Sequence, residues 1–251
     1  MRIVSLVPSL TELVCELGLA EQLVGRTGFC VHPREIVRGI PKVGGTKSVD
    51  LEKVRALEPT HVILNRDENR LETAEALAGF VPNIVVTHPL APEDNLALYR
   101  QLGDAFGREQ EAEALCARFA PALEQARGLV RPPRRVLYLI WKDPWMTVSR
   151  DTYISRTLAV FGWQTVPADG VERYPKLEEL RGAGAELVLL SSEPYRFREA
   201  HRAEVEALAG LPALLVDGEM TSWYGPRAIA GLGYLAELTA QASRGGSPPA
   251  R

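Results

Sequence analysis

The chain has 251 residues, of which 46% are hydrophobic and 24% are charged, and its formal net charge is -3. These values are typical of a folded globular protein of one or two domains, and they exclude a disordered or fibrous chain. The negative net charge argues against the basic surface that nucleic-acid binding requires. The three scattered cysteines are too few for a disulfide framework.

The N-terminal residues predict a strand and then a helix. The apolar run from Arg2 to Val7 is typical of a buried strand. Pro8 ends it, and the residues from Ser9 to Glu12 form a capping-box pattern in which the Ser9 side chain caps a helix that runs to Gly18. No export signal precedes this strand, and no run is long enough to cross a bilayer. We therefore expect a cytoplasmic protein that does not span a membrane, whereas a trimmed N-terminus would allow a periplasmic or extracellular one.

The rest of the chain alternates between apolar runs of strand length and amphipathic helices. In chain order we expect a strand at 23–26, a helix from Leu51, a strand at 61–64, a helix ending at Gly79, a strand at 84–87, a long helix at about 109–130, a strand at 135–141, a strand at 213–216 and a helix from Pro226 to about Ala242. Pro121 lies within the long helix and should kink it rather than end it.

A recurring segment predicts two lobes of one plan. In both copies we predict a short amphipathic helix followed by an apolar run of strand length. The helix at Leu51 to Arg55 leads into the run at 60–64, and the helix at Leu177 to Arg181 leads at the same offset into the run at 186–190. We therefore predict an α/β fold with two Rossmann-like lobes, each with a parallel sheet, joined by one long α-helix, and with a ligand cleft between the lobes. The predicted parts are an N-terminal lobe at 1–108, a linking helix at 109–131, a C-terminal lobe at 132–242 and a disordered tail at 243–251.

Four motifs resemble the helical-backbone substrate-binding proteins of ABC importers. They are the opening residues 2–13, the Val43-Gly44-Gly45 loop, the helix and turn at 51–60, and the long mid-chain helix. This family contains the receptors for cobalamin, ferric siderophores and haem and, in a sister group, those for bare metal ions. The resemblance implies a monomeric receptor that requires no cofactor, holds such a ligand between its lobes and delivers it to an ABC permease. The chain departs from the family in having no export signal, so a cytoplasmic carrier or sensor is an alternative role.

Candidate ligand-binding residues follow the predicted strands, because an open parallel sheet binds its ligand at the carboxyl ends of the strands. They are Pro8, Ser9, Phe29, Cys30, His32, Gly45, Lys47, Asp67 and Glu68 in the first lobe, and Trp141, Lys142, Trp145, Met146, Glu193, Trp223 and Tyr224 in the second. Aromatic walls suit large planar ligands, so we expect a corrinoid, a haem or a ferric siderophore. The alternative is that Trp141 and Trp223 close the core of the second lobe.

A transition-metal ion is the alternative ligand. Cys30, His32 and His88 offer the thiolate and imidazole donors that zinc, iron, cobalt and nickel accept, although their spacing is not that of a compact metal motif.

Two further expectations concern the partner and catalysis. The resemblance implies docking on the permease through an acidic residue of each lobe, for which Glu68 or Glu72 and Glu193 or Glu199 are the candidates. We expect a binding protein rather than an enzyme, because the sequence contains no nucleophile elbow, phosphate-binding loop or dinucleotide fingerprint. A chelatase-like or corrinoid-processing enzyme on the same fold is the alternative.

Overall fold

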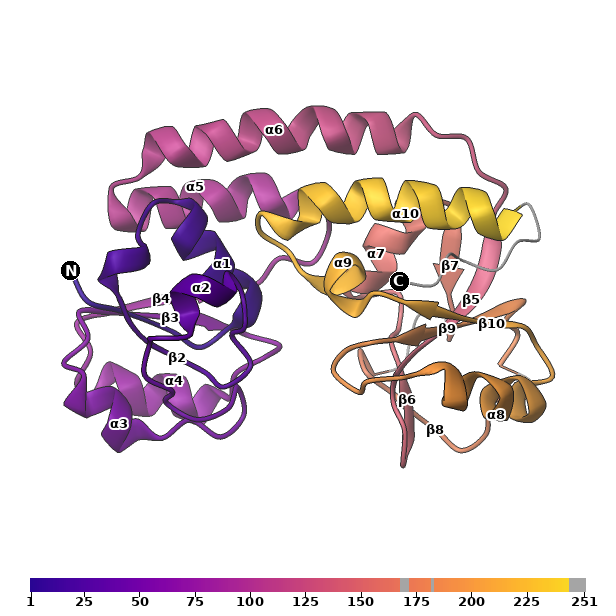
Figure 1. Cartoon of the computed structure of the whole chain (residues 1–251), viewed down its shortest axis with the longest axis horizontal. Coiled ribbons are helices and arrows are strands. Elements are labelled where there is room, and N and C mark those ends of the chain that lie inside the picture. Colours follow the sequence, from indigo (N-terminus) through magenta and orange to yellow (C-terminus); the bar gives the residue numbers. More distant parts are fainter. Residues whose placement is uncertain (168–171, 182, 244–251) are drawn as a thin grey trace. The chain divides into compact units, whose positions relative to one another are not determined.

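The computed structural model describes residues 1–167, 172–181 and 183–243, so the tail predicted at 243–251 lies outside the described residues from residue 244 onward. Contacts divide the chain into two compact units (Figure 1). Unit 1 comprises Met1–Pro89, Asp94–Arg118 and Tyr224–Pro226, and unit 2 comprises the remaining residues. The chain passes from unit 1 to unit 2 inside helix α6 (Glu109–Arg127), which contains Pro121 and ends before Gly128.

Unit 1 is built around a parallel sheet of four strands in the order β2-β1-β3-β4. Its elements are β1 (Ile3–Ser5), α1 (Pro8–Glu16), the 3-10 helix η1 (Ala20–Gln22), β2 (Leu23–Arg26), α2 (Arg34–Val37), α3 (Leu51–Ala56), β3 (His61–Asn65), α4 (Leu71–Ala78), β4 (Asn83–Thr87), α5 (Asp94–Phe106) and the first part of α6. In Figure 1, α3 and α4 lie on one side of this sheet, and α1 and α5 lie on the other.

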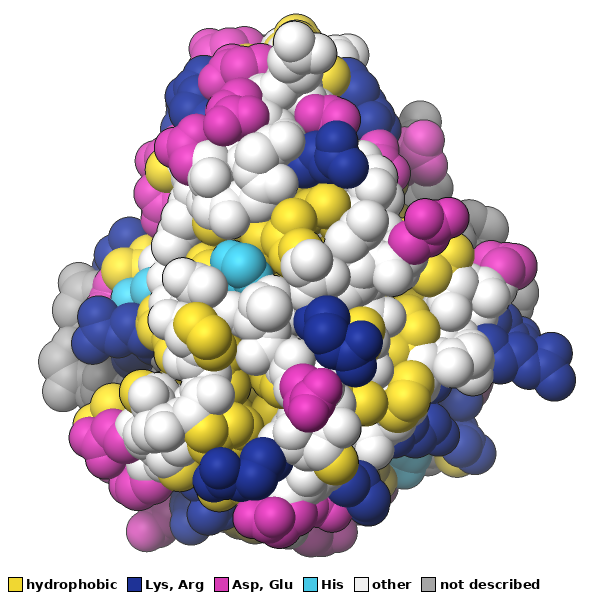
Figure 2. All heavy atoms as spheres, turned by 90° about the vertical axis from the view of Figure 1, so that its left-hand side faces the viewer, with side chains coloured by type: hydrophobic (Ala, Val, Ile, Leu, Met, Phe, Trp, Pro, Cys, Tyr) yellow, Lys and Arg dark blue, Asp and Glu magenta, His cyan; other side chains and the backbone are white. Residues whose placement is uncertain are grey.

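The central strands β1 and β3 of the unit 1 sheet are buried almost throughout, as expected for parallel strands covered by helices. Every residue of β1 is buried, and Val4, Val62 and Leu64 form one core with Val54 of α3 and Leu77 of α4. The Asp50 side chain fixes the start of α3 by accepting a hydrogen bond from the backbone amide of Lys53. On the face in Figure 2, acidic and basic side chains are interspersed among hydrophobic ones.

Unit 2 contains a six-stranded sheet in which β10-β9-β5 and β7 are parallel. Its elements after α6 are β5 (Arg134–Trp141), β6 (Trp145–Thr147), α7 (Tyr153–Val160), β7 (Trp163–Thr165), β8 (Lys176–Leu177), β9 (Leu187–Ser191), α8 (Glu199–Ala209), β10 (Ala213–Val216), α9 (Gly218–Ser222) and α10 (Arg227–Ser243). The antiparallel strands β6 and β8 extend this sheet, which the sequence analysis did not predict.

The core of unit 2 surrounds β9, in which every residue is buried. Leu137 and Leu139 of β5 and Val188 and Leu190 of β9 pack there against Val205 of α8. Helix α8 ends at Gly210, whose φ of 69° is the left-handed conformation that glycine adopts without a steric cost.

The predicted capping box at Ser9 is wrong. Helix α1 begins at Pro8, its N-cap is Val7, and no side chain caps it. Proline favours the first helical position because its φ is already helical and it has no amide hydrogen to satisfy there. The N-cap is therefore two residues earlier than the pattern indicated, and Ser9 is buried in the first turn.

The helix predicted at 177–181 is also wrong. Lys176 and Leu177 form β8 and pair with Met146 and Trp145 of β6, and Leu180 is buried in the core of unit 2. A segment of five residues is too short to offset the cost of nucleating a helix unless packing favours it. The first copy of the recurring segment forms α3, whereas the second copy does not form a helix.

In the part of the chain that the structure describes, no helix is both long enough and apolar enough to cross a membrane.

The packing of α10 on α9 yields a matched pair of glycine substitutions. A Cβ atom at Gly231 would lie 2.3 Å from the carbonyl oxygen of Met220, whereas a Cβ atom at Gly233 would meet nothing within 4 Å. We expect Gly231→Ala to lower the free energy of unfolding by about 1–3 kcal/mol through overpacking. Gly233→Ala should leave it unchanged or raise it by up to about 1 kcal/mol, because alanine favours a helix over glycine. Urea denaturation measures both values, and equal effects would contradict the close contact.

Candidate functional site

Parallel pairing brings the residues that follow the strands of unit 1 to one edge of its sheet. The chain leaves β1 towards Pro8, β2 towards Phe29, β3 towards Asp67 and β4 towards His88. The Phe29 side chain is 63% exposed, which is unusual for a large aromatic ring. A Cβ atom at Gly45 would lie 3.2 Å from this ring, so the structure brings these two predicted residues together.

Hydrogen bonds order the loop that follows β3. The Asn65 side-chain oxygen accepts from the backbone amides of Asp67 at 2.8 Å and Glu68 at 3.3 Å. The Lys47 ammonium donates to the Asp67 carbonyl oxygen at 2.6 Å, and His88 Nε2 lies 3.4 Å from Asp67 Oδ1. Lys47, Asp67, Glu68 and His88 therefore form one polar group at the carboxyl end of this strand.

Tyr224 was predicted with the second lobe, but its contacts place it in unit 1. Its hydroxyl donates to Glu68 Oε1 at 2.6 Å. Burial, together with the nearby Glu68 charge, holds the pKa of Tyr224 well above its ordinary value. The next residue is fixed as well, because the Gly225 amide donates to Asn95 Oδ1 at 2.7 Å and the Tyr99 hydroxyl donates to the Gly225 carbonyl at 2.9 Å.

Cys30 lies in the interior of unit 1. Its side chain is fully buried, and its sulfur lies 3.1 Å from the Thr27 hydroxyl and 3.9 Å from the Ser5 carbonyl oxygen. Burial raises the pKa of the thiol, so Cys30 stays protonated at neutral pH. The structure does not bring Cys30, His32 and His88 together as metal donors, and among the described residues no three His, Cys, Asp or Glu side chains gather to hold an ion.

Aromatic side chains form a cluster at the end of β5 in unit 2. Trp141 is 40% exposed and meets Tyr195 edge to face, with ring centroids 5.7 Å apart. Tyr195 contacts Phe197 at 4.7 Å, and Phe197 stacks on Trp145 at 6.3 Å. The Trp141 ring therefore packs against the aromatic cluster through Tyr195, and part of the ring is exposed to solvent.

Two predicted neighbours of Trp141 have different surroundings. The Lys142 ammonium donates to both carboxylate oxygens of Glu204, at 2.7 Å and 2.6 Å. The Lys142 charge is therefore paired with the Glu204 carboxylate. Met146 is half-buried and lies opposite Trp141 in the antiparallel pairing of β5 and β6. Met146 therefore lies beside the aromatic cluster.

Glu193 and Trp223 are joined in unit 2. The Trp223 indole Nε1 donates to Glu193 Oε2 at 2.8 Å. Burial raises the pKa of Glu193 to about 7. The guanidinium carbon of Arg227 lies 5.0 Å from the Trp223 ring centroid, and Arg227 also pairs with Glu219 at 3.1 Å. Arg227 was not among the predicted residues, because nothing in the sequence indicates that it stacks on Trp223.

Hydroxyl groups form a second network that the sequence analysis missed. The Tyr138 hydroxyl donates to Ser191 Oγ at 3.0 Å and contacts the Thr221 hydroxyl, and all three residues are buried. A tyrosine in the middle of an apolar strand is the one signal that could have indicated a buried polar partner.

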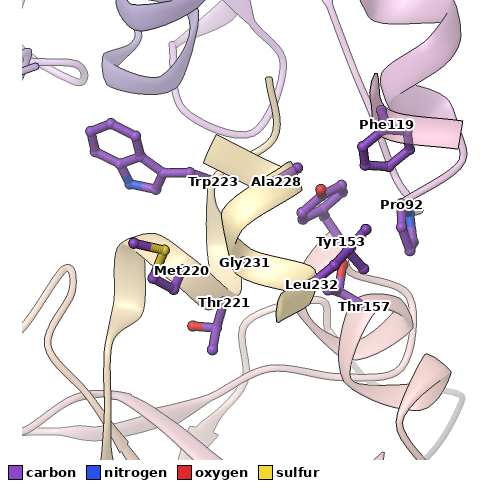
Figure 3. Close-up of a pocket in the computed structure, with 10 residues that line it drawn as sticks. All are labelled: Pro92, Phe119, Tyr153, Thr157, Met220, Thr221, Trp223, Ala228, Gly231 and Leu232. Carbon is purple, nitrogen blue, oxygen red and sulfur yellow. The ribbon is translucent and has the colours of Figure 1, made fainter. Parts of the chain in front are cut away.

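A small pocket in unit 2 lies between α7, α9 and α10 (Figure 3). Its volume is about 10 Å³, which is room for about one water molecule and far too little for a macrocycle. It is lined by Pro92, Phe119, Tyr153, Thr157, Met220, Thr221, Trp223, Ala228, Gly231 and Leu232. In Figure 3 the Trp223 indole projects away from the rings of Tyr153 and Phe119.

The four glutamates considered for docking fall into two groups. Glu72 and Glu199 are exposed in the first turns of α4 and α8, the helices that follow β3 and β9. Glu68 and Glu193 instead accept hydrogen bonds from Tyr224 and Trp223.

Known proteins share this fold. The vitamin B12-binding protein of Pectobacterium carotovorum is 24% identical over 234 residues, which cover 91% of this chain and 84% of that protein. An ABC transporter substrate-binding lipoprotein of Bacillus subtilis is 25% identical over 251 residues, covering 94% and 79%.

Solved structures agree with these relatives and confirm the predicted two-lobed α/β class. A periplasmic heme-binding protein from Roseiflexus sp. RS-1 superposes with a TM-score of 0.81 at 24% identity, covering 95% of this chain and 96% of that one. The periplasmic vitamin B12 binding protein of Vibrio cholerae superposes with a TM-score of 0.83 at 18% identity, covering 97% and 98%. The sequence profile described as "Periplasmic binding protein" matches residues 3–176, which is more than half of the chain. The chain therefore belongs to the periplasmic binding protein family, as its opening motif indicated.

Proposed function

We propose that this chain is the substrate-binding protein of an ABC importer and that its ligand is a metal-containing macrocycle, with a corrinoid favoured over a haem. Family membership supports the role of a receptor. The relatives support the ligand class, because they include vitamin B12-binding proteins and the structural neighbours include heme-binding proteins.

The observation that carries the proposal is an exposed aromatic ring after a parallel strand in each unit. Phe29 follows β2 and is 63% exposed, and Trp141 ends β5 and is 40% exposed. Leaving such rings in water costs free energy that a large apolar or planar ligand recovers by covering them. A bare metal ion is too small to cover either aromatic ring.

The chemistry of Cys30 also favours a macrocycle over a bare ion. The thiolate is the form that binds a metal, and burial raises the pKa of this thiol. Cys30 therefore acts as a buried apolar residue with weak contacts to Ser5 and Thr27.

We assign permease docking to Glu72 and Glu199. Both are exposed and occupy the same place, the first turn of the helix that follows a central strand of their unit. Glu68 and Glu193 suit this role less well, because each carboxylate accepts a hydrogen bond from a buried aromatic residue.

Titration of the tryptophan fluorescence tests the ligand. We expect cyanocobalamin and cobinamide to quench it at a stoichiometry of one, haemin to bind more weakly, and zinc or iron salts to leave it unchanged. A response to a bare salt alone, or to none of these compounds in a folded protein, would sink the proposal. Recovery of unaltered ligand after incubation with excess distinguishes binding from turnover.

Substitutions separate the two ligand classes. Cys30→Ser and His32→Ala should each weaken corrinoid binding by no more than about 1–2 kcal/mol, the scale of one hydrogen bond. Trp141→Ala should cost more, because it removes a large contact surface. Leu208→Ala, which truncates an exposed apolar side chain on α8, is the matched control. Loss of binding in His32→Ala with Trp141→Ala intact would indicate an ion receptor.

Docking is tested by stimulation of the ATPase of the cognate transporter in proteoliposomes. We expect Glu72→Ala and Glu199→Ala to reduce stimulation while the affinity for the ligand stays unchanged, because both carboxylates lie on the surface. Glu75→Ala, one turn further along α4 and also exposed, is the control. Normal stimulation by the double variant would refute this assignment.

A further inference from the structure

We propose that Glu193 and Glu68 are positioning residues for ligand binding: within unit 2, Glu193 fixes the ring of Trp223, and within unit 1, Glu68 fixes the ring of Tyr224. The inference rests on the proposed function, because it concerns how the ligand site is held in place. It assigns these glutamates a role other than permease docking.

In unit 2, the Trp223 indole is held at its edge and on one face. Its Nε1 donates to Glu193 Oε2 at 2.8 Å, and the Arg227 guanidinium lies over the ring. Glu193 is itself fixed, because the Ser191 hydroxyl donates to its carbonyl at 2.6 Å and accepts from its amide at 3.2 Å. Only 7% of the Trp223 surface is exposed, so the contacts with Glu193 and Arg227 leave the ring little freedom to turn.

In unit 1, the Tyr224 ring is held by the equivalent interaction. Its hydroxyl donates to Glu68 Oε1 at 2.6 Å, and Asn65 orders the Glu68 backbone from the end of β3. The backbone after Tyr224 turns at Gly225, where φ is 85° and both backbone polar groups are bonded within unit 1. Tyr224 is also only 7% exposed, so its ring has little freedom to turn.

The two glutamates occupy corresponding places. Glu68 comes shortly after β3, and Glu193 comes shortly after β9, and each of these strands pairs in parallel with a neighbour on both sides. Both glutamates are half-buried, and each carboxylate accepts a hydrogen bond from an aromatic donor. Losing such a charged hydrogen bond costs free energy, which keeps both side chains on their aromatic donors. The adjacent residues Trp223 and Tyr224 are thereby fixed independently, each by a carboxylate of its own unit.

The charge of Glu193 makes this arrangement sensitive to pH. Burial raises the pKa of Glu193 to about 7. The negative charges of Glu219 and Asp217 also raise this pKa, whereas the hydrogen bond from Trp223 and the positive charge of Arg227 lower it. Tyr138 of β5 is a further titratable group near Glu193, and it stays neutral because burial raises its pKa. Below the pKa of Glu193, the neutral carboxyl accepts the indole hydrogen more weakly than the carboxylate does.

The test is the dissociation constant of cyanocobalamin, measured by calorimetry for two double-mutant cycles. One cycle combines Glu193→Ala with Trp223→Phe, and the other combines Glu68→Ala with Tyr224→Phe. We expect each alanine variant to bind about tenfold more weakly, the effect of one charged hydrogen bond. Within a cycle the costs should not add, because both changes remove the same bond.

Three further measurements separate positioning from a general loss of structure. Glu193→Gln keeps an acceptor oxygen and should bind within about threefold of the wild-type protein. The wild-type affinity should fall as the pH decreases from about 8 to about 6, whereas that of Glu193→Gln should not. Glu237→Ala removes an exposed carboxylate from α10 and should change nothing.

The outcomes are distinguishable. A folded wild-type protein that does not bind cyanocobalamin contradicts the proposed function and the inference with it. A wild-type protein that binds, with alanine variants within about twofold of it or with additive costs in both cycles, overturns the positioning roles alone. If either alanine variant fails to fold, Glu193→Gln and the two phenylalanine variants decide between the outcomes, because Glu193→Gln and Tyr224→Phe keep the side-chain size and Trp223→Phe keeps an aromatic ring. Unchanged binding in all three, with no pH difference, overturns the inference.

Discussion

Both units depend on parallel strands that are buried on both faces. Such strands can exist only where helices cover the sheet, and in β1 and β9 every residue is buried. The same pairing places the carboxyl ends of the strands at one edge. The polar residues that follow β3 and β9 are therefore gathered there by the geometry of the sheet, and the apolar core of each unit stays free of them.

The last residues of those strands order the loops that carry the candidate site. Asn65 ends β3 and bonds the amides of Asp67 and Glu68, and Ser191 ends β9 and bonds the backbone of Glu193. A polar side chain at the end of a buried strand satisfies backbone groups that would otherwise be unpaired. The same polar side chain also fixes the backbone of the glutamate that follows it. Strand pairing therefore orders the loop, and the ordered loop places the carboxylate that orients the aromatic ring.

Local patterns predicted strands β1 to β5, β9 and β10 and much of the helical structure, but they did not predict β6, β7 or β8. The runs at 23–26 and 213–216 form β2 and β10 with the expected bounds, because short apolar runs specify buried strands wherever helices can cover them. The failures arose where neighbours decide the outcome. Helix α1 begins at Pro8, so Ser9 lies inside the helix and cannot cap it. At the start of the segment predicted as a helix at 177–181, Leu177 belongs to β8 and pairs with β6.

The candidate site was less predictable than the fold, because its contacts join residues far apart in the sequence. Glu68 and Tyr224 are separated by 156 positions and Glu193 and Trp223 by 30, and no local pattern records such a pair. Position after a strand did identify all four residues as candidates. It could not show that the glutamates hold the rings, or that Cys30 is fully buried.

The central claim is that aromatic side chains, rather than metal donors, hold the ligand. A crystal structure of the protein grown with cyanocobalamin tests it most directly. We expect one corrinoid bound, with atoms of Phe29 or Trp141 within about 4 Å of it, the distance of apolar contact. A corrinoid that touches neither ring, or a bare ion bound by His32 or His88, would contradict this claim.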